Sequence, residues 1–305
     1  MNLIFVFLDG VGLAERSVRN PFFLTPMTRF KDVFGCEFFL EDVPYITADK
    51  VMLALDAGLG VEGTGESGTG QFSIYTGVNG AKYFGRHYGA QIPSSLRAVL
   101  AEENIFRKLK ALGKTCCYAN AYPKGFIAWC LEQRAKGKVR SSVLFEAAIL
   151  ERIPIRSREA LKAGEAISGD MIARWWRLNE PDGDAPVQEI SATQAARNLL
   201  TLSHHYDAVF YEFFLTDLVA HGKIDTAAAE IVTQLDEFLS VLIAELPEQT
   251  MLLLTSDHGN FEDTSTTRHT RNPVPFLAVG KEAVALSHIR AIDEVCKVML
   301  QAAVL

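Results

Sequence analysis

Residues 251–260 have the sequence Met-Leu-Leu-Leu-Thr-Ser-Asp-His-Gly-Asn, in which an apolar run ends in a carboxylate and an imidazole. The run Met251–Thr255 is short and apolar and follows a long helical pattern, which predicts a strand buried on both faces. Asp257 and His258 come directly after this strand. Because ligands of parallel sheets bind beyond the carboxyl ends of the strands, this stretch predicts both a sheet and a binding site at its edge.

The same arrangement recurs elsewhere in the chain. Asp9 follows a second apolar run, and Asp217 follows a third. The other predicted strands are Leu3–Leu8, Lys114–Asn120, Ala208–Phe214 and Val274–Val279. Helical patterns are predicted at Ser94–Leu112, from a capping pattern at Ser191 onward, at Thr226–Leu246 and at Ala291–Val304. Apolar strands that alternate with helices predict an α/β fold with a mostly parallel sheet covered on both faces.

The composition is that of a globular protein. The 305 residues are 49% hydrophobic, which is enough for one large domain with a sizeable core. A net charge of −7 argues against nucleic acid as the main partner, because such binding depends on clustered positive charge. The five cysteines are odd in number and form no CxxC pair, so we expect reduced core thiols and a cytoplasmic location. We expect neither a signal peptide nor a membrane span, because Asp9 interrupts the first apolar run and no apolar segment reaches ~18 residues.

One segment, residues 123–186, interrupts the alternation of strands and helices. It contains eleven Lys/Arg and nine Asp/Glu residues, a net charge of +2 in a chain whose net charge is −7. We predict that it forms a small helical insert, or cap, on a catalytic core made of residues 1–122 and 187–305. Cations in this segment, which would attract an anionic substrate, are Lys124, Arg134, Lys136, Lys138 and Arg140. The alternative to a cap is that residues 123–186 form ordinary solvent-exposed helices.

A glycine-rich turn, Glu66-Ser-Gly-Thr-Gly-Gln71, precedes a helix predicted at Gln71–Thr76. The overlapping Gly63–Gly68 spacing matches GxGxxG, but no good strand precedes it, so we set a dinucleotide site aside. The turn also lacks the lysine of a Walker loop. Amides at a helix N-terminus favour an anion, and a serine hydroxyl beside a metal can act as a nucleophile. Ser67 is therefore the candidate nucleophile, with Thr69 as the rival hydroxyl.

Carboxylates and imidazoles occur in several short groups. Asp217 and His221 are four residues apart, so on a helical turn they share a face. His269 follows His258 after eleven residues. Each residue taken alone could have a purely structural role, such as a strand-end turn, a surface helix contact or a loop histidine. A structural origin for the whole set would require all of these roles to hold at once, which favours a metal site. Together with a serine these residues form a ligand set for two divalent cations, zinc or manganese: Asp9, Ser67, Asp217, His221, Asp257, His258 and His269.

These residues, in this order, resemble the alkaline phosphatase superfamily of two-metal enzymes, and in particular its branch of cofactor-independent phosphoglycerate mutases and phosphopentomutases. The motifs that carry the resemblance are Phe7-Leu-Asp-Gly-Val-Gly12, Asn20-Pro21 with Thr25-Pro26, Ser67-Gly-Thr-Gly-Gln71, Asp217–His221, Thr255-Ser-Asp-His-Gly-Asn260 and His269-Thr-Arg-Asn-Pro-Val-Pro275. The resemblance covers the core at both ends of the chain and says little about residues 123–186. It implies a three-layer sandwich with a mostly parallel central sheet.

The resemblance also implies roles for individual residues. One metal would be held by Asp217, His221 and His269, and the second by Asp9, Asp257, His258 and the Ser67 oxygen. Ser67 would form a phosphoserine with a phosphoryl group taken from a small phosphorylated metabolite. The candidate substrate contacts are Thr69, Gln71, His87 and Lys124.

Two departures from the mutase pattern affect the expected activity. The insert has only 64 residues, and Gln71 stands where those mutases often have histidine. Both favour a phosphomonoesterase over an intramolecular phosphomutase of the phosphoglycerate or phosphosugar type. A non-catalytic metal-binding homologue is the third alternative. The substrate, the choice between zinc and manganese, and the oligomeric state stay open.

Overall fold

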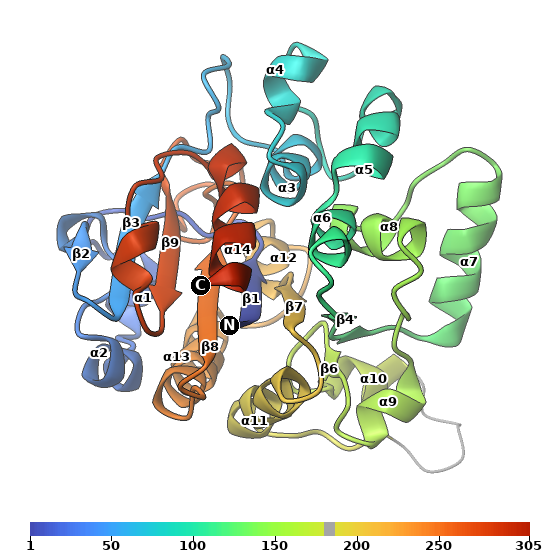
Figure 1. The fold of residues 1–305 in the computed structure, drawn as a ribbon. Helices are drawn as coiled ribbons and strands as arrows, with labels where there is room; N and C mark the ends of the chain where they lie inside the picture. The colour runs from blue at the N-terminus through green and yellow to red at the C-terminus, as the bar shows by residue number, and fades with distance from the viewer. Residues whose placement is uncertain (180–186) are drawn as a thin grey trace.

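The computed structural model describes residues 1–179 and 187–305 and contains a seven-stranded sheet between two helical layers (Figure 1). Its strands are β1 (Asn2–Leu8), β2 (Tyr45–Ile46), β3 (Lys50–Leu55), β4 (Cys116–Tyr118), β7 (Ala208–Phe213), β8 (Thr250–Thr255) and β9 (Val274–Val279). They are ordered β2-β3-β9-β8-β1-β7-β4. The strands β8, β1, β7 and β4 are parallel, whereas β9 is antiparallel to both β8 and β3. The predicted α/β class is confirmed, with a mixed region at one side of the sheet.

Both faces of the sheet are buried by helices. Alternate residues of β1 point to opposite faces, so that Phe5 lies in one hydrophobic core and Val6 in the other. The first core contains side chains of α3 (Ser67–Thr76), α5 (Arg97–Glu103), α6 (Ile105–Ala111), α8 (Val143–Leu150) and α14 (Val295–Val304). The second contains side chains of α2 (Thr28–Phe34), α11 (Ala192–Ser203), α12 (Leu215–Ala220) and α13 (Ala228–Ala244). This arrangement is the predicted three-layer sandwich.

The remaining elements are short or peripheral. They are the helices α1 (Pro21–Leu24), α4 (Gly80–Phe84), α7 (Lys124–Ala135), α9 (Arg158–Lys162) and α10 (Arg174–Asn179), and 3-10 turns at Leu40–Asp42, Ser94–Leu96, Ala283–Leu286 and Ile292–Glu294. The predicted cap of α11 is confirmed, because the Ser191 side chain accepts a hydrogen bond from the amide of Gln194.

The predicted strand at Lys114–Asn120 is divided in two. Its first part forms β4, whereas Asn120 begins β5 (Asn120–Ala121), which pairs with β6 (Ile167–Ser168) in a second small sheet. The side chain of Asn120 causes this division. It accepts from the amide of Glu212 at 2.8 Å and donates to the carbonyl of Glu212 at 2.7 Å, so a side-chain amide replaces backbone pairing with β7.

The segment 123–186 is not separate from the core along its whole length. Its helix α8 packs against α3 and α6, and Leu144 and Phe145 are almost inaccessible to solvent. Helix α7, at the edge of the molecule in Figure 1, buries Cys130 and leaves much of its surface exposed. The predicted end of the insert, at residues 180–186, lies outside the described residues. A cap therefore stays a proposal, and it concerns α7 and α10 rather than α8.

All five cysteines are buried and unpaired, as predicted. Within the described residues, no helix combines the length and the apolar character needed to cross a bilayer.

Candidate metal centre and nucleophile

The predicted ligands lie in loops at the carboxyl ends of parallel strands. Asp9 follows β1, Asp217 lies on α12 after β7, and His258 follows β8, while His269 lies in the loop between β8 and β9. The turn after β1 contains Gly10, whose φ is +67°. A Cβ on this glycine would lie 2.8 Å from Asp217 Oδ1, so glycine permits both the turn and the close approach of α12.

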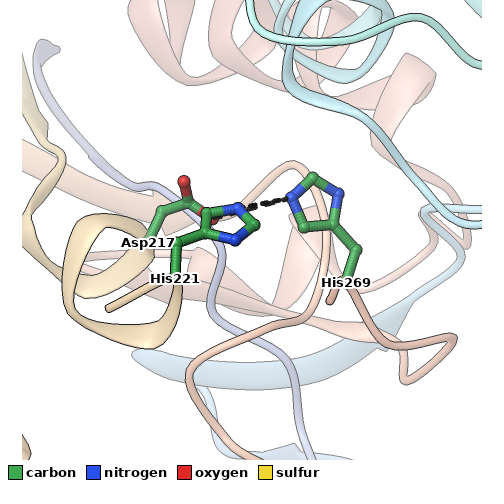
Figure 2. Close-up of side chains that lie close together, drawn as sticks. All are labelled: Asp217, His221 and His269. Atoms are coloured by element: carbon green, nitrogen blue, oxygen red, sulfur yellow. Dashed lines mark hydrogen bonds and ion pairs between the residues drawn. The ribbon is translucent and has the colours of Figure 1, made fainter. Parts of the chain in front are cut away.

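The first cluster consists of Asp217, His221 and His269, whose donor atoms face one another (Figure 2). His221 Nε2 lies 3.3 Å from Asp217 Oδ1 and 3.1 Å from His269 Nε2. His269 Nε2 lies 3.7 Å from the same carboxylate oxygen. One carboxylate and two imidazoles this close together fit the three protein ligands of a zinc-type site.

Hydrogen bonds to the other ring nitrogens orient the two imidazoles of this cluster. His221 Nδ1 lies 2.8 Å from the carbonyl oxygen of Thr267, and His269 Nδ1 lies 2.8 Å from that of Gly65. Because a carbonyl oxygen only accepts, each Nδ1 carries a proton and donates it. With the proton on Nδ1, Nε2 is the nitrogen of each ring that can bind a metal, and in both rings it faces the cluster.

The second cluster consists of Ser67, Asp9, Asp257 and His258. His258 Nε2 lies 3.0 Å from Ser67 Oγ. The same nitrogen is 3.6 Å from one oxygen of Asp9 and 3.6 Å from one oxygen of Asp257. The ring of His258 also stacks on that of His269, with 3.7 Å between centroids. The two clusters are therefore in direct contact.

The carboxylate of Asp9 fits a bound cation in the second cluster. Its Oδ1 is buried and has no hydrogen-bond partner among the described residues. Burial, together with the negative charges of Asp257 and Asp217, raises the pKa of Asp9 well above its usual value. Carboxylates buried side by side are costly unless a positive charge neutralises them. The donors of Asp9 and Asp217 also lie within 4.8 Å of each other, so Asp217 stands between the two clusters. These residues fit bound divalent metal.

Helix α3 begins at Ser67, so the candidate nucleophile is the first helical residue, and the predicted start at Gln71 was wrong. The glycines of this turn permit the helix to pack tightly. A Cβ on Gly70 would lie 2.9 Å from Asp257 Cβ, so glycine lets α3 approach the end of β8. This close packing holds Ser67 against His258 at the amide end of a helix, where an anion is favoured.

The rival hydroxyl of Thr69 has other partners. Thr69 is completely buried, and its Oγ1 donates to the carbonyl of Glu66 at 3.3 Å and accepts from the amide of Tyr88 at 3.2 Å. These contacts fix the local backbone. The assignment of Ser67 as nucleophile stays a prediction, and this geometry favours it over Thr69.

Glu262 is a residue of the site that the sequence reasoning missed. Its buried carboxylate accepts hydrogen bonds from the amides of Gly12 (2.8 Å) and Asn260 (2.8 Å), from the side-chain amide of Asn272 (2.9 Å) and from the hydroxyl of Thr270. It thereby joins the loop that follows β1 to both ends of the loop between β8 and β9, which carries His269. Asn260 also donates to Asp217 Oδ1 at 2.9 Å, which fixes a predicted ligand. No spacing rule marks Glu262 in the sequence, although it stands only two residues after the Asp-His-Gly-Asn motif.

We expect Glu262→Gln to loosen these loops. The new amide group would face hydrogen-bond donors, which should lower the free energy of unfolding by about 1–3 kcal/mol. Metal affinity should fall by about 10–100-fold, because residues that orient ligands typically contribute this much. Denaturant unfolding of the metal-free protein and a metal titration measure the two effects. Glu248→Gln, at an exposed position, is the matched control. Unchanged unfolding and unchanged affinity would contradict the anchoring role.

A cavity of about 520 Å³ opens beside both clusters. Its wall includes Asp9, Ser67, Tyr122 and Asp217 from the predicted core and Arg140 and Trp176 from the predicted insert. Of the predicted substrate contacts, only Gln71 lines this cavity. Gln71 Nε2 also donates to Asp257 Oδ2 at 3.2 Å, so part of its role is to orient that carboxylate.

The other three predicted substrate contacts lie outside this cavity. Thr69 is buried behind the helix start. His87 Nε2 lies 3.3 Å from the carbonyl of Val61. Lys124 is exposed and forms an ion pair with Glu159 at 2.6 Å. Their assignment rested on sequence proximity and charge, and neither determines which way a side chain points.

Comparison with known proteins agrees with this geometry. Residues 183–299, which include the predicted ligands from Asp217 onward, match a family model described as the metalloenzyme superfamily. The structure resembles alkaline phosphatase from the Antarctic bacterium TAB5, with a TM-score of 0.52 and 12% identity, over 99% of this chain and 98% of that chain. The matched part of the chain therefore resembles the metalloenzyme superfamily, and the fold resembles that of an alkaline phosphatase. The PH0037 protein from Pyrococcus horikoshii has a similar fold, with a TM-score of 0.56 and 14% identity, over 99% of this chain and 96% of that chain.

Two relatives matched over part of the chain agree with the predicted resemblance to the phosphomutase branch. The chain is 34% identical over 122 residues to 2,3-bisphosphoglycerate-independent phosphoglycerate mutase of Aliivibrio fischeri, which is 37% of this chain and 24% of that protein. It is 35% identical over 105 residues to the protein of the same name from Clostridium perfringens, which is 31% of this chain and 20% of that protein. The chain thus spans about a quarter or less of the length of these curated relatives.

Proposed function

We propose that this protein is a metal-dependent phosphomonoesterase in which Ser67 accepts the phosphoryl group. The observation that carries the proposal is the position of Ser67. Its hydroxyl lies 3.0 Å from His258, at the start of α3, on the wall of a cavity that also includes Asp9 and Asp217. This combines a nucleophile, an anion-favouring helix end and two clusters of metal donors at one place.

The donor atoms support two divalent cations, either zinc or manganese. Asp217, His221 and His269 would hold one ion, and Asp9, Asp257, His258 and the Ser67 oxygen would hold the other. When bound, the ions would lower the pKa of the Ser67 hydroxyl and neutralise charge on the attacking and leaving oxygens.

The residues of the chain would then carry out two displacements. Ser67 Oγ gives up its proton and bonds to phosphorus while the bond between phosphorus and the substrate oxygen breaks, and the alcohol leaves with a proton. Gln71 and Asn260 hold Asp257 and Asp217 in place during this step. Water then bonds to phosphorus, the bond to Ser67 Oγ breaks, and the products are inorganic phosphate and the restored serine.

Two cations in the cavity wall favour an anionic substrate. Arg140 and Lys223 both line the cavity, and neither has an ion-pair partner among the described residues. Other cations of the insert are neutralised by acidic neighbours: Lys124 by Glu159, Arg134 by Glu146 and Lys136 by Glu132. We therefore expect Arg140 and Lys223 to attract the anionic substrate, and not all the cations of residues 123–186.

We expect Arg140→Ala to raise the KM for phosphate monoesters about tenfold and to change kcat much less, because a charged contact to the bound anion is lost. Steady-state kinetics at several salt concentrations measure this effect. Lys124→Ala is the control, since Lys124 is exposed, ion-paired and outside the cavity. An equal KM in both variants would remove Arg140 from the binding site.

An intramolecular phosphomutase is the second candidate, because the relatives matched over part of the chain are phosphoglycerate mutases. In a mutase, a second hydroxyl of the same substrate rather than water would take the phosphoryl group from Ser67. The deciding experiment is a screen of metal-reconstituted protein against sugar phosphates, nucleotides and glycerate phosphates. Release of inorganic phosphate supports the esterase, and an isomeric phosphate without release supports the mutase. Metal binding without either product would support a non-catalytic protein.

A further inference from the structure

The cavity beside the metal centre has an unusually aromatic wall. Aromatic residues make up 10% of the chain, yet six residues of the cavity wall are aromatic: Tyr122, Phe126, Phe145, Trp175, Trp176 and Phe214. We propose that the substrate is a phosphate monoester whose alcohol part carries a planar aromatic ring. This inference rests on the proposed function and specifies the class of substrate.

One side of the wall is formed by rings that pack on each other. Tyr122 and Phe126 are stacked, with centroids 5.3 Å apart and planes at 18°. Phe145, from α8, meets Tyr122 edge to face at 5.1 Å. Offset stacking and edge-to-face contacts are the arrangements that aromatic rings prefer, so this side offers a further ring a favourable surface.

A buried carboxylate holds this side of the wall in place. The hydroxyl of Tyr122 lies 2.7 Å from that of Tyr118, and Tyr118 donates to Glu212 at 2.6 Å. Ser142, at the start of α8, donates to the same carboxylate at 2.7 Å. Glu212 lies on β7, so the wall is connected to the centre of the sheet. A surface held in this way is formed before the ligand arrives, and little entropy is lost when a rigid ring binds to it.

The other aromatic residues line the same cavity as Asp9, Ser67 and Asp217. Phe214 is only three residues from the ligand Asp217, and it is half-buried. Trp175 and Trp176 lie on α10, whose start is fixed because the amide of Trp175 donates to Asp170 at 2.7 Å. A ring bound along this wall would therefore lie close to a phosphoryl group at the metal centre.

Beside the aromatic rings, the polar groups of Asp170, Ser142 and Tyr122 are occupied within the protein, which disfavours a polyhydroxylated alcohol part at that side of the wall. Asp170 accepts hydrogen bonds from the Ser168 hydroxyl and from two backbone amides. Ser142 donates to Glu212 and caps α8. Sugar or glycerate hydroxyls would lose water here and find few new partners, whereas an aromatic ring would cover apolar surface. The cavity volume of about 520 Å³ accommodates a ligand of this size.

Binding can be measured without turnover by using phosphonates, which are not hydrolysed. The chain has three tryptophans, and Trp129→Phe leaves only the two that line the cavity. Metal-reconstituted Trp129→Phe protein is titrated with benzylphosphonate and with methylphosphonate while tryptophan fluorescence is recorded. We expect a saturable change whose midpoint for benzylphosphonate is at least about tenfold lower than for methylphosphonate, because the ring adds an aromatic contact.

The kinetic test uses two neighbouring rings of α7. Phe126 lines the cavity, whereas Trp129, with its centroid 6.1 Å from that of Phe126, is exposed and does not. Phe126→Ala should lower kcat/KM for benzyl phosphate about tenfold and leave that for glycerol 3-phosphate within about twofold. Both substrates are esters of primary alcohols, so their intrinsic reactivity is similar. Phe126→Leu, which keeps apolar bulk, should give a smaller loss, and Trp129→Ala should change neither rate.

The outcomes separate this inference from the proposed function. Equal midpoints for the two phosphonates, or equal effects of Phe126→Ala on both substrates, would overturn the aromatic substrate while leaving a phosphomonoesterase. Selective binding of benzylphosphonate without hydrolysis of any monoester would overturn the esterase and keep the aromatic site. Absence of both binding and turnover would overturn both proposals.

Discussion

Replacing Ser67 by alanine is expected to lower phosphatase activity by about three orders of magnitude or more. The substitution removes the only side-chain atom that would bond to phosphorus, and loss of a covalent nucleophile has effects of this size. The fold should be retained, because Ser67 Oγ makes one hydrogen bond, to His258, and the alanine methyl group fits the same space. Steady-state turnover of an aryl phosphate, with protein that contains its full complement of metal, measures the effect.

The matched control is Thr69→Val, which keeps the shape of the rival side chain and removes its hydroxyl. Thr69 bonds only to backbone groups in the structure, so this variant should lose some stability and keep most of its activity. Acid quenching during turnover should also trap phosphate covalently on the parent protein and not on Ser67→Ala. Near-normal turnover of Ser67→Ala together with inactive Thr69→Val would move the nucleophile to Thr69.

The second large effect is expected from His269→Ala. This change removes one of three donors in the first cluster, so the metal content of reconstituted protein should fall from two ions per chain to about one. Activity should fall at least about a hundredfold, since two-metal catalysis needs both ions to stabilise the attacking and leaving oxygens. Elemental analysis after removal of excess metal gives the stoichiometry.

His288→Ala is the control for this experiment, because His288 is exposed and, among the described residues, its ring bonds to the carbonyl of Ala285 alone. It should retain both ions and full activity. A parent protein that never binds more than one ion would contradict the two-site model. Equal metal content in the parent and in His269→Ala would remove His269 from the ligand set.

The sequence predicts the central strands well, because their physical signal is local. Leu3–Leu8 and Met251–Thr255 are continuous apolar runs, and both are strands with two buried faces. β3 was missed, since Lys50–Leu55 is a brief apolar run that leads into a glycine-rich segment. The antiparallel direction of β9 was also missed. The direction of β9 depends on how the loop after β8 returns to the sheet, and that loop is organised by Glu262.

The candidate site also has a part that the sequence predicts and a part that it does not. The predicted ligands stand out in the sequence because acids and imidazoles that follow strands carry a chemical signal in their own residue types, and the structure brings Asp217, His221 and His269 together. The aromatic wall could not be found from the sequence. Its members, such as Tyr122, Phe145 and Trp176, are ordinary apolar residues of separate segments, and only the packing of the folded chain places them around one cavity.

The position of β1 has a consequence for biosynthesis. β1 pairs with β7 on one side and β8 on the other. Leu3 therefore cannot form its native pairs until Ala208 and Met251 have been synthesised. At roughly 5–20 residues per second, the ribosome needs roughly 10–40 s to make the first of these partners. Throughout this time an apolar strand with two unpaired edges is present on the nascent chain, a substrate for chaperones and a nucleus for aggregation. The predicted ligands span a longer interval, from Asp9 to His269, so the proposed metal centre cannot be completed before His269 has been synthesised.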